Sequence, residues 1–178
     1  GAALHLYENY YLLVIFYKHY SSKEMKIEKN TVVSINYVLL DSTGKTMEKT
    51  DSPVNYLHGG YDEIFPIVEE ELQNKEIGYS GNILMLPENH FGEYESTLVH
   101  IEPRSKFPDN IEIGLQFEGE EETSKATLIY TITDITEDKV VVDGNHPLAG
   151  LTLHFDCTVT GVRPATEEEV SHGHVHDE

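Results

Sequence analysis

Three histidines near the end of the chain are the residues whose type and spacing most directly suggest chemistry. They alternate in the stretch His172-Gly173-His174-Val175-His176, and Asp177 and Glu178 follow as oxygen donors. Alternate side chains of an extended segment point to one side, and imidazole suits Ni²⁺, Zn²⁺ and Cu²⁺. We therefore expect these histidines to bind a single divalent ion, Ni²⁺ or Zn²⁺. The alternative is an idle, solvated tail.

The other histidines and the cysteine suggest no second reactive centre. His58, His90, His146 and His154 have no further ligand at a spacing typical of a metal site, so we expect loop or surface residues. Cys157 is the only cysteine and allows no internal disulfide. Because disulfides are rare in reducing compartments, this composition favours a cytoplasmic location.

The net charge argues against two classes of partner. The 178 residues include 12 Lys and Arg against 32 Asp and Glu, a formal net charge of -20. Such a chain is repelled by nucleic-acid phosphates and by anionic lipid surfaces. We therefore expect neither nucleic acid nor a membrane as a partner. A chain of this length has room for one ordinary domain or two small ones.

Residues 1–24 are patterned differently from the rest. Their only strongly apolar run, Leu12 to Phe16, is too short to span a bilayer. They also lack the basic start and the cleavage site of a secretory signal. We expect residues 1–24 to be an N-terminal extension or a wrongly placed start, upstream of a domain that begins at Met25. The alternative is an added helix or strand that packs on the body of the protein.

Alternating apolar and polar residues predict strands at both ends of the main domain. One strand begins at Thr31 and ends in a turn at residues 41–44. Residues 83–86 predict another, and residues 151–159 predict a long last strand. Since a terminal strand that follows an inserted segment needs a partner, we expect it to join the sheet begun at Val33.

A single short helix is expected between these strands. Asp62 can cap its start, Pro66 fits its first turn, and Asn74 lies near its end. Its apolar stripe has the helical spacing i, i+4, i+8 and consists of Ile64, Val68 and Leu72.

The middle of the chain has a composition of its own. Prolines stand at positions 103 and 108, an acidic run covers residues 118–122, and β-rich stretches cover residues 126–135 and 139–142. A turn cluster at residues 143–147 closes the segment. We expect a separate small β domain here.

Several short motifs occur together in a recognisable order. They are VVSINY at 32–37, YLHGG at 56–60, EIG at 76–78, FGEY at 91–94, DGNHPLAG at 143–150 and ATEEE at 165–169. In this order the motifs resemble the SlyD-like branch of the FKBP-type peptidyl-prolyl cis-trans isomerases. The resemblance extends over residues 25–176, and the block at 143–150 is its most specific part.

The resemblance implies an α+β fold, an FKBP-like antiparallel sheet wrapped on a short helix, with an inserted β-rich flap domain. It implies an isomerase domain at residues 25–94 plus 148–166 and an inserted chaperone domain at residues 95–147. Residues 167–178 would be an acidic, His-containing tail.

The resemblance also implies the function, a monomeric prolyl isomerase with holdase activity toward unfolded or proline-containing polypeptides. Rotation about an X-Pro bond faces a barrier of ~18–20 kcal/mol. The enzyme needs an apolar pocket that favours the twisted amide, and no cofactor is required. Two alternatives remain, a nickel or zinc metallochaperone that uses the tail and a chaperone with little isomerase activity.

Site residues are likewise implied by the resemblance. Glu48 stands where the family usually has Asp, and Phe91 stands where Tyr is frequent, so lower activity is expected. The catalytic residues would be Tyr37, Glu48, Phe91 and Phe155. The substrate-binding residues would be Met47, Leu57, Ile64, Phe65 and Val68. The client-holding residues of the inserted domain, unless they form its core, would be Leu98, Val99, Ile101, Phe107, Ile111, Ile113 and Leu115.

Overall fold

The chain forms two compact units. The computed structural model describes residues 25–121 and 124–176. One unit consists of the described residues up to Met85 together with those from Thr152 onward, and the other is Leu86–Leu151. The two segments that enter and leave the second unit bond to each other, for example from the Gly150 N–H to the Gly92 carbonyl at 2.8 Å, and the boundaries predicted after residue 94 and before residue 148 lie within this unit.

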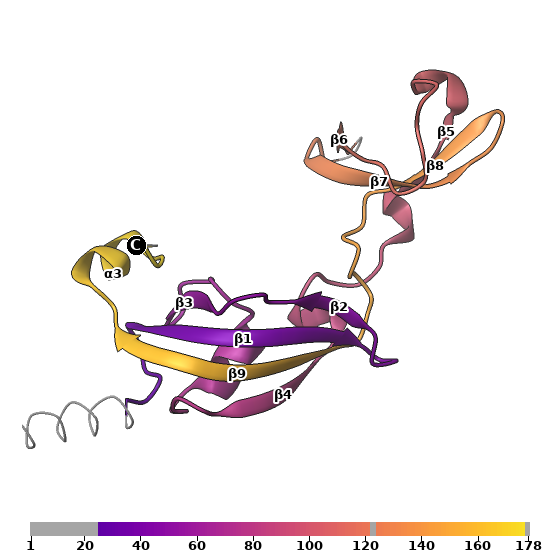
Figure 1. Ribbon diagram of the computed structural model, residues 1–178. Helices are drawn as coiled ribbons and strands as arrows, with labels where there is room; N and C mark the ends of the chain where they lie inside the picture. The colour runs from indigo at the N-terminus through magenta and orange to yellow at the C-terminus, as the bar shows by residue number, and fades with distance from the viewer. Residues whose placement is uncertain (1–24, 122–123, 177–178) are drawn as a thin grey trace, which may run out of the picture. The chain divides into compact units, whose positions relative to one another are not determined.

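The first unit is built on an antiparallel sheet in the order β2-β1-β9-β4, with β3 also paired to β1. Its strands are β1 (Thr31–Asp41), β2 (Thr46–Lys49), β3 (Val54–His58), β4 (Ser80–Met85) and β9 (Leu153–Pro164). Strand β9 lies between β1 and β4 (Figure 1) and pairs with the whole of β1, from Thr31↔Pro164 to Asp41↔Leu153. The prediction that the last strand joins the first sheet is confirmed.

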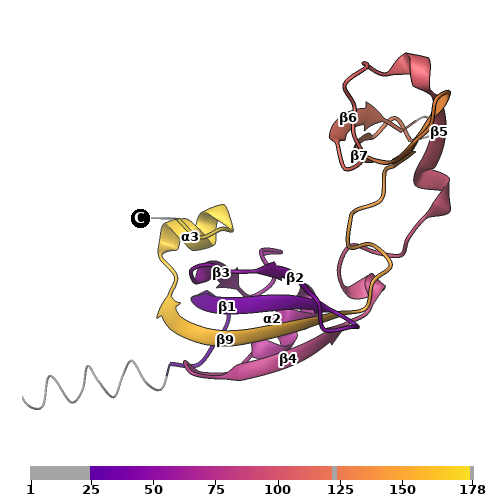
Figure 2. The same cartoon turned by 45° about the vertical axis from the view of Figure 1, so that its right-hand side comes forward.

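Helix α2 (Pro66–Leu72) lies beside this sheet (Figure 2) and buries Val68 and Leu72 completely. Pro66 occupies the first turn as predicted. The prediction that Asp62 caps the helix is wrong, because the chain is still turning at Asp62, where φ is 59°, and the helix begins only after Phe65. The helix ends at Leu72 with Gln73 as its C-cap, close to the predicted end near Asn74.

The second unit has its own sheet and its own core. Its four antiparallel strands are β5 (Val99–Pro103), β8 (Lys139–Asp143), β7 (Thr127–Ile135) and β6 (Gln116–Glu120), in that spatial order. Three short 3₁₀ turns are η1 (Pro87–Asn89), η2 (Ser96–Leu98) and η3 (Arg104–Lys106). The buried core consists of Tyr130, Ile132, Val140 and Val142.

The C-terminal tail contains a helix that the patterning did not predict. Helix α3 (Glu167–His172) follows β9, and Thr166 caps it by accepting a hydrogen bond from the Glu169 N–H. The prediction for residues 1–24 lies outside the described residues. Within the described ranges, no helix is long and apolar enough to cross a membrane.

Candidate functional site

An apolar cavity of about 480 Å³ lies in the first unit. Its walls come from β1, β3, β9 and the segment that leads into α2. The lining residues include no Ser, Cys, His or Lys, and the ionisable side chains among them are those of Tyr37, Tyr56, Asp62 and Glu63. The lining residues are Ile35, Tyr37, Val54, Asn55, Tyr56, Asp62, Glu63, Ile64, Phe65, Pro66 and Phe155.

Two aromatic side chains from neighbouring central strands form one wall. Tyr37 of β1 and Phe155 of β9 stack with ring centroids 4.7 Å apart and an interplanar angle of 21°. Phe155 is only 3% exposed, while Tyr37 is half-buried. Because alternate residues of a strand share a face, the rings lie on the same side of the sheet as the buried Ile35 and Leu39.

Glu48 is the hydrogen-bond partner of the Tyr37 hydroxyl, the polar end of this aromatic pair. The Tyr37 hydroxyl donates a hydrogen bond to the Glu48 carboxylate, which β2 places there through the pairing Leu39↔Glu48. Burial of the phenol, together with the neighbouring carboxylate, raises the pKa of Tyr37 to about 12. Tyr37 therefore remains a neutral hydroxyl near neutral pH.

The cavity contains some of the predicted substrate-binding residues and not others. Ile64 and Phe65 line it, on the segment just before α2. Leu57 and Val68 are completely buried in the core and do not line it. Met47 is half-buried on β2 and is also absent from the lining.

Phe91 belongs to the second unit, where it stacks on His146 with centroids 3.5 Å apart. The ring is 41% exposed. On the same connecting segment, His90 donates from Nε2 to the Leu151 carbonyl at 2.7 Å. These contacts give the two histidines structural partners within the connecting segments.

The tertiary structure adds lining residues that the sequence did not reveal. Tyr56 is buried, lines the cavity, and its hydroxyl donates to Nδ1 of His58 at 3.0 Å.

His58 itself lies in the core beside the cavity and does not line it. Its Nε2 donates to Gln73 at 2.7 Å. The prediction of a loop or surface position for His58 is wrong, because this histidine is 1% exposed and ends β3.

Glu63 joins the cavity to the C-terminal tail. Its Oε2 accepts a hydrogen bond from the Leu57 N–H at 2.6 Å, and its Oε1 accepts one from the Val175 N–H at 3.3 Å. One carboxylate on the cavity wall is therefore held by β3 and by the histidine stretch.

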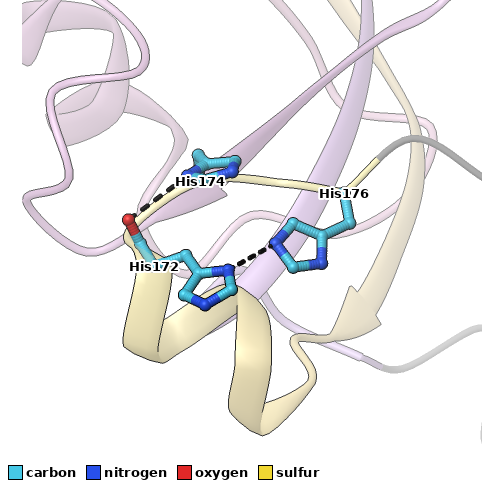
Figure 3. A group of neighbouring side chains, drawn as sticks. All are labelled: His172, His174 and His176. Carbon is cyan, nitrogen blue, oxygen red and sulfur yellow. Dashed lines mark hydrogen bonds between the residues drawn. The ribbon is translucent and has the colours of Figure 1, made fainter.

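The three C-terminal histidines converge (Figure 3). The possible ligand atoms of His172, His174 and His176 all lie within 4.8 Å of one another. His172 Nδ1 and His176 Nε2 are hydrogen-bonded at 2.9 Å, and His174 Nδ1 donates to the His172 carbonyl at 3.2 Å. The expected extended segment is wrong, because His172 ends α3 and Gly173, with φ of 75°, turns the chain back. Three converging imidazoles suit a divalent transition-metal ion.

The chain is similar to curated proteins along most of its length. It is 40% identical over 156 residues to the FKBP-type peptidyl-prolyl cis-trans isomerase SlyD of Vibrio cholerae, covering 85% of this chain and 76% of that protein. Identity is 38% to SlyD of Haemophilus influenzae and 35% to SlyD of Escherichia coli, again over 85% of this chain and over 80% and 78% of those proteins. No protein-family model matches the chain.

The chain belongs to the SlyD family of FKBP-type isomerases. The resemblance seen in the motifs is thereby confirmed, and the enzyme class is peptidyl-prolyl cis-trans isomerase. The sheet-rich, α+β architecture agrees with membership of the SlyD family.

For a SlyD-family enzyme with this cavity, we expect Tyr37→Phe to lower kcat/KM on a short proline peptide about 2- to 10-fold. The ring would stay on Phe155, while the hydrogen bond to Glu48, of a kind worth about 0.5–1.5 kcal/mol, would be lost. The Tyr61→Phe variant is the control, because its hydroxyl donates to Asn30 and Tyr61 does not line the cavity. An equal loss in both variants would contradict a specific role for Tyr37.

The same variant tests the pH dependence of stability. The folded-state pKa of Tyr37 lies above the ordinary tyrosine value of about 10. Its contribution to the free energy of unfolding is therefore fully present below pH ~10 and is lost as the pH rises toward about 12. Denaturant titrations should show a steeper alkaline loss in the native protein than in Tyr37→Phe.

Proposed function

We propose that the chain accelerates proline-limited folding by isomerising prolyl bonds in the cavity walled by Tyr37 and Phe155. The observation that carries this proposal is a mainly apolar cavity with a stacked aromatic wall and no Ser, Cys, His or Lys in its lining. Isomerisation breaks no covalent bond and needs only rotation about the C–N bond. Such a site suits the reaction without a cofactor.

The cavity can favour the twisted amide over the planar one. In the planar amide the carbonyl oxygen carries partial negative charge, which water stabilises, whereas twisting removes conjugation and shifts electron density back to nitrogen. A prolyl ring against Phe155, Ile64 and Phe65 would have its amide withdrawn from water. Since the planar form then loses more stabilisation than the twisted form, the barrier falls.

The direct test is refolding of an unfolded protein whose slow step is prolyl isomerisation. Catalytic amounts of the chain should shorten the slow phase, which takes tens to hundreds of seconds uncatalysed, without changing its amplitude. A slow phase with unchanged kinetics in the presence of intact chain would overturn the proposal.

We also propose that the second unit is an inserted flap domain that holds unfolded clients. Ile101 and Ile113 are 66% and 64% exposed, and Leu115 and Ile129 are also exposed. Phe107 and Ile111 pack on the buried core instead. The predicted client-holding set therefore divides into surface and core residues. Exposed aliphatic side chains can bind unfolded segments weakly and raise their concentration at the enzyme.

We further propose that the protein is monomeric and cytoplasmic, and that it binds neither nucleic acid nor membranes. The support for this proposal is the formal net charge of -20 and the single, buried Cys157.

A second candidate function, nickel or zinc binding, is favoured by the convergence of the three histidines. Bound there, the ion would be held by imidazole nitrogens and would fix the tail. We expect the triple replacement of His172, His174 and His176 by alanine to abolish micromolar Ni²⁺ binding in calorimetric titrations. Refolding catalysis should stay within about two-fold, because none of the three lines the cavity.

His154→Ala is the matched control for this experiment, since His154 lies on β9 and is not one of the converging histidines. It should leave Ni²⁺ binding unchanged. A Kd of the native chain for Ni²⁺ in the millimolar range or above would exclude nickel binding as a function of the tail.

A further inference from the structure

Glu169 is a buried carboxylate in a tail that is otherwise mostly exposed. It lies at the third position of α3 and is 1% exposed. Its two oxygens accept hydrogen bonds from Arg163 at 2.7 and 2.9 Å, from the Thr166 N–H at 2.8 Å and from the His176 N–H at 3.2 Å. A buried charge with this many partners has essentially one position available to it.

These partners tie three separate pieces of chain together. Arg163 lies near the end of β9 and is paired with Val32 of β1, so it is fixed to the central sheet. Thr166 caps α3. His176 follows the turn that leaves α3. Glu169 therefore fixes the His176 backbone relative to the central sheet, while Glu63 holds the neighbouring Val175 N–H.

The reversal of chain direction after α3 explains why the three imidazole rings converge. Gly173 closes α3 with its N–H on the Glu169 carbonyl at 2.8 Å, in a left-handed conformation that suits glycine. This turn reverses the chain after His172. The bond from the His176 N–H to the Glu169 carboxylate then holds the third imidazole beside the first.

Glu169 is not itself placed to bind a cation. Its oxygens are buried and already accept four hydrogen bonds. The Arg163 guanidinium holds the pKa of this carboxyl far below its usual range. Glu168 differs, because its side chain is 81% exposed and only one oxygen approaches His176, at 4.0 Å from Nδ1.

We propose that Glu169 is the positioning residue of a divalent-cation site formed by His172, His174 and His176. By holding His176 while locked to Arg163, it assembles the three imidazoles before the ion arrives. A preassembled site loses less conformational entropy on binding. This inference rests on the proposed cation binding of the tail.

The test is Ni²⁺ affinity in the full chain, measured by calorimetry, with the Co²⁺ absorption spectrum as a second measurement. Glu169→Gln should raise the Ni²⁺ Kd about 10- to 100-fold, the usual effect of losing a residue that orients metal ligands. The Co²⁺ spectrum should also change, because the ligand geometry changes. Glu168→Gln, the exposed control, should change the Kd less than about three-fold.

A second control separates positioning from helix stability. Thr166→Ala removes the side-chain cap of α3 but keeps the Glu169 carboxylate, Arg163 and His176. It should raise the Kd much less than Glu169→Gln does. If both variants weaken binding equally and give the same Co²⁺ spectrum, Glu169 only stabilises the helix and the inference is wrong.

The remaining outcomes are also decisive. If the native chain binds no Ni²⁺ below millimolar concentrations, the cation site fails together with its positioning residue. If the native chain binds Ni²⁺ tightly and the Kd of Glu169→Gln is within two-fold of the native Kd, the cation site is supported and the positioning role of Glu169 is wrong. Isomerase activity on a short peptide verifies that the first unit is folded in every variant.

Discussion

Replacing Phe155 with alanine is expected to lower kcat/KM for prolyl isomerisation about 100-fold. The ring is 3% exposed, lines the cavity and stacks on Tyr37. Its removal would admit water to the site and leave Tyr37 without its stacking partner. Truncating a buried Phe costs about 3–5 kcal/mol of stability, and a loss of about 2.7 kcal/mol in the transition state corresponds to the expected rate effect. Initial rates on a short proline peptide measure it.

Two further variants separate catalysis from stability. Ile83 of β4 pairs with Phe155, is buried, and does not line the cavity. Ile83→Ala should therefore destabilise the fold by about 2–5 kcal/mol while kcat/KM stays within about three-fold. The kcat/KM of Phe155→Leu, which keeps an apolar side chain, should lie between that of the native protein and that of Phe155→Ala. A folded Phe155→Ala with native activity would refute the assignment of this cavity.

Sequence patterning predicted the sheet better than it predicted the site. Alternation identified β1 and β9, because one side of each strand faces a core. It could not separate Phe155 from an ordinary core residue, since both give the same alternating pattern. The family motifs pointed to Tyr37 and Phe155, yet they equally pointed to Leu57 and Val68, which the fold buries completely. Whether an apolar residue faces core or cavity depends on how the segment before α2 packs against the sheet strands β1, β3 and β9.

In the C-terminal tail, sequence patterning missed a polar residue that the fold buries. A run of three glutamates normally indicates a solvated face, and nothing in that run distinguishes Glu169 from its neighbours. Its burial depends on the position of Arg163 at the end of β9 and on the turn at Gly173. The spacing of Thr166 and Glu169, a capping box, was the available signal for α3.

Replacing residues 95–147 with a short loop should separate the two proposed activities. The ends of this segment lie close together, because the Asn145 side chain bonds to both the N–H and the carbonyl of Glu95, at 2.8 and 2.9 Å. A short loop can therefore close the gap with little strain on the first unit. Activity on a short proline peptide should stay within about three-fold, because no residue of the segment lines the cavity.

Catalysis of protein refolding should fall by a much larger factor in the same variant, about 10- to 100-fold in kcat/KM, because weak holding of the client would be lost. The double variant Ile101→Ser and Ile113→Ser should reproduce part of this loss, since both side chains are exposed and neither belongs to the buried core of the second unit. Glu137→Ser, an exposed polar position in the same unit, is the matched control. If refolding rates survive removal of the segment, the second unit has no role in client capture, and isomerisation at the cavity alone accounts for folding catalysis.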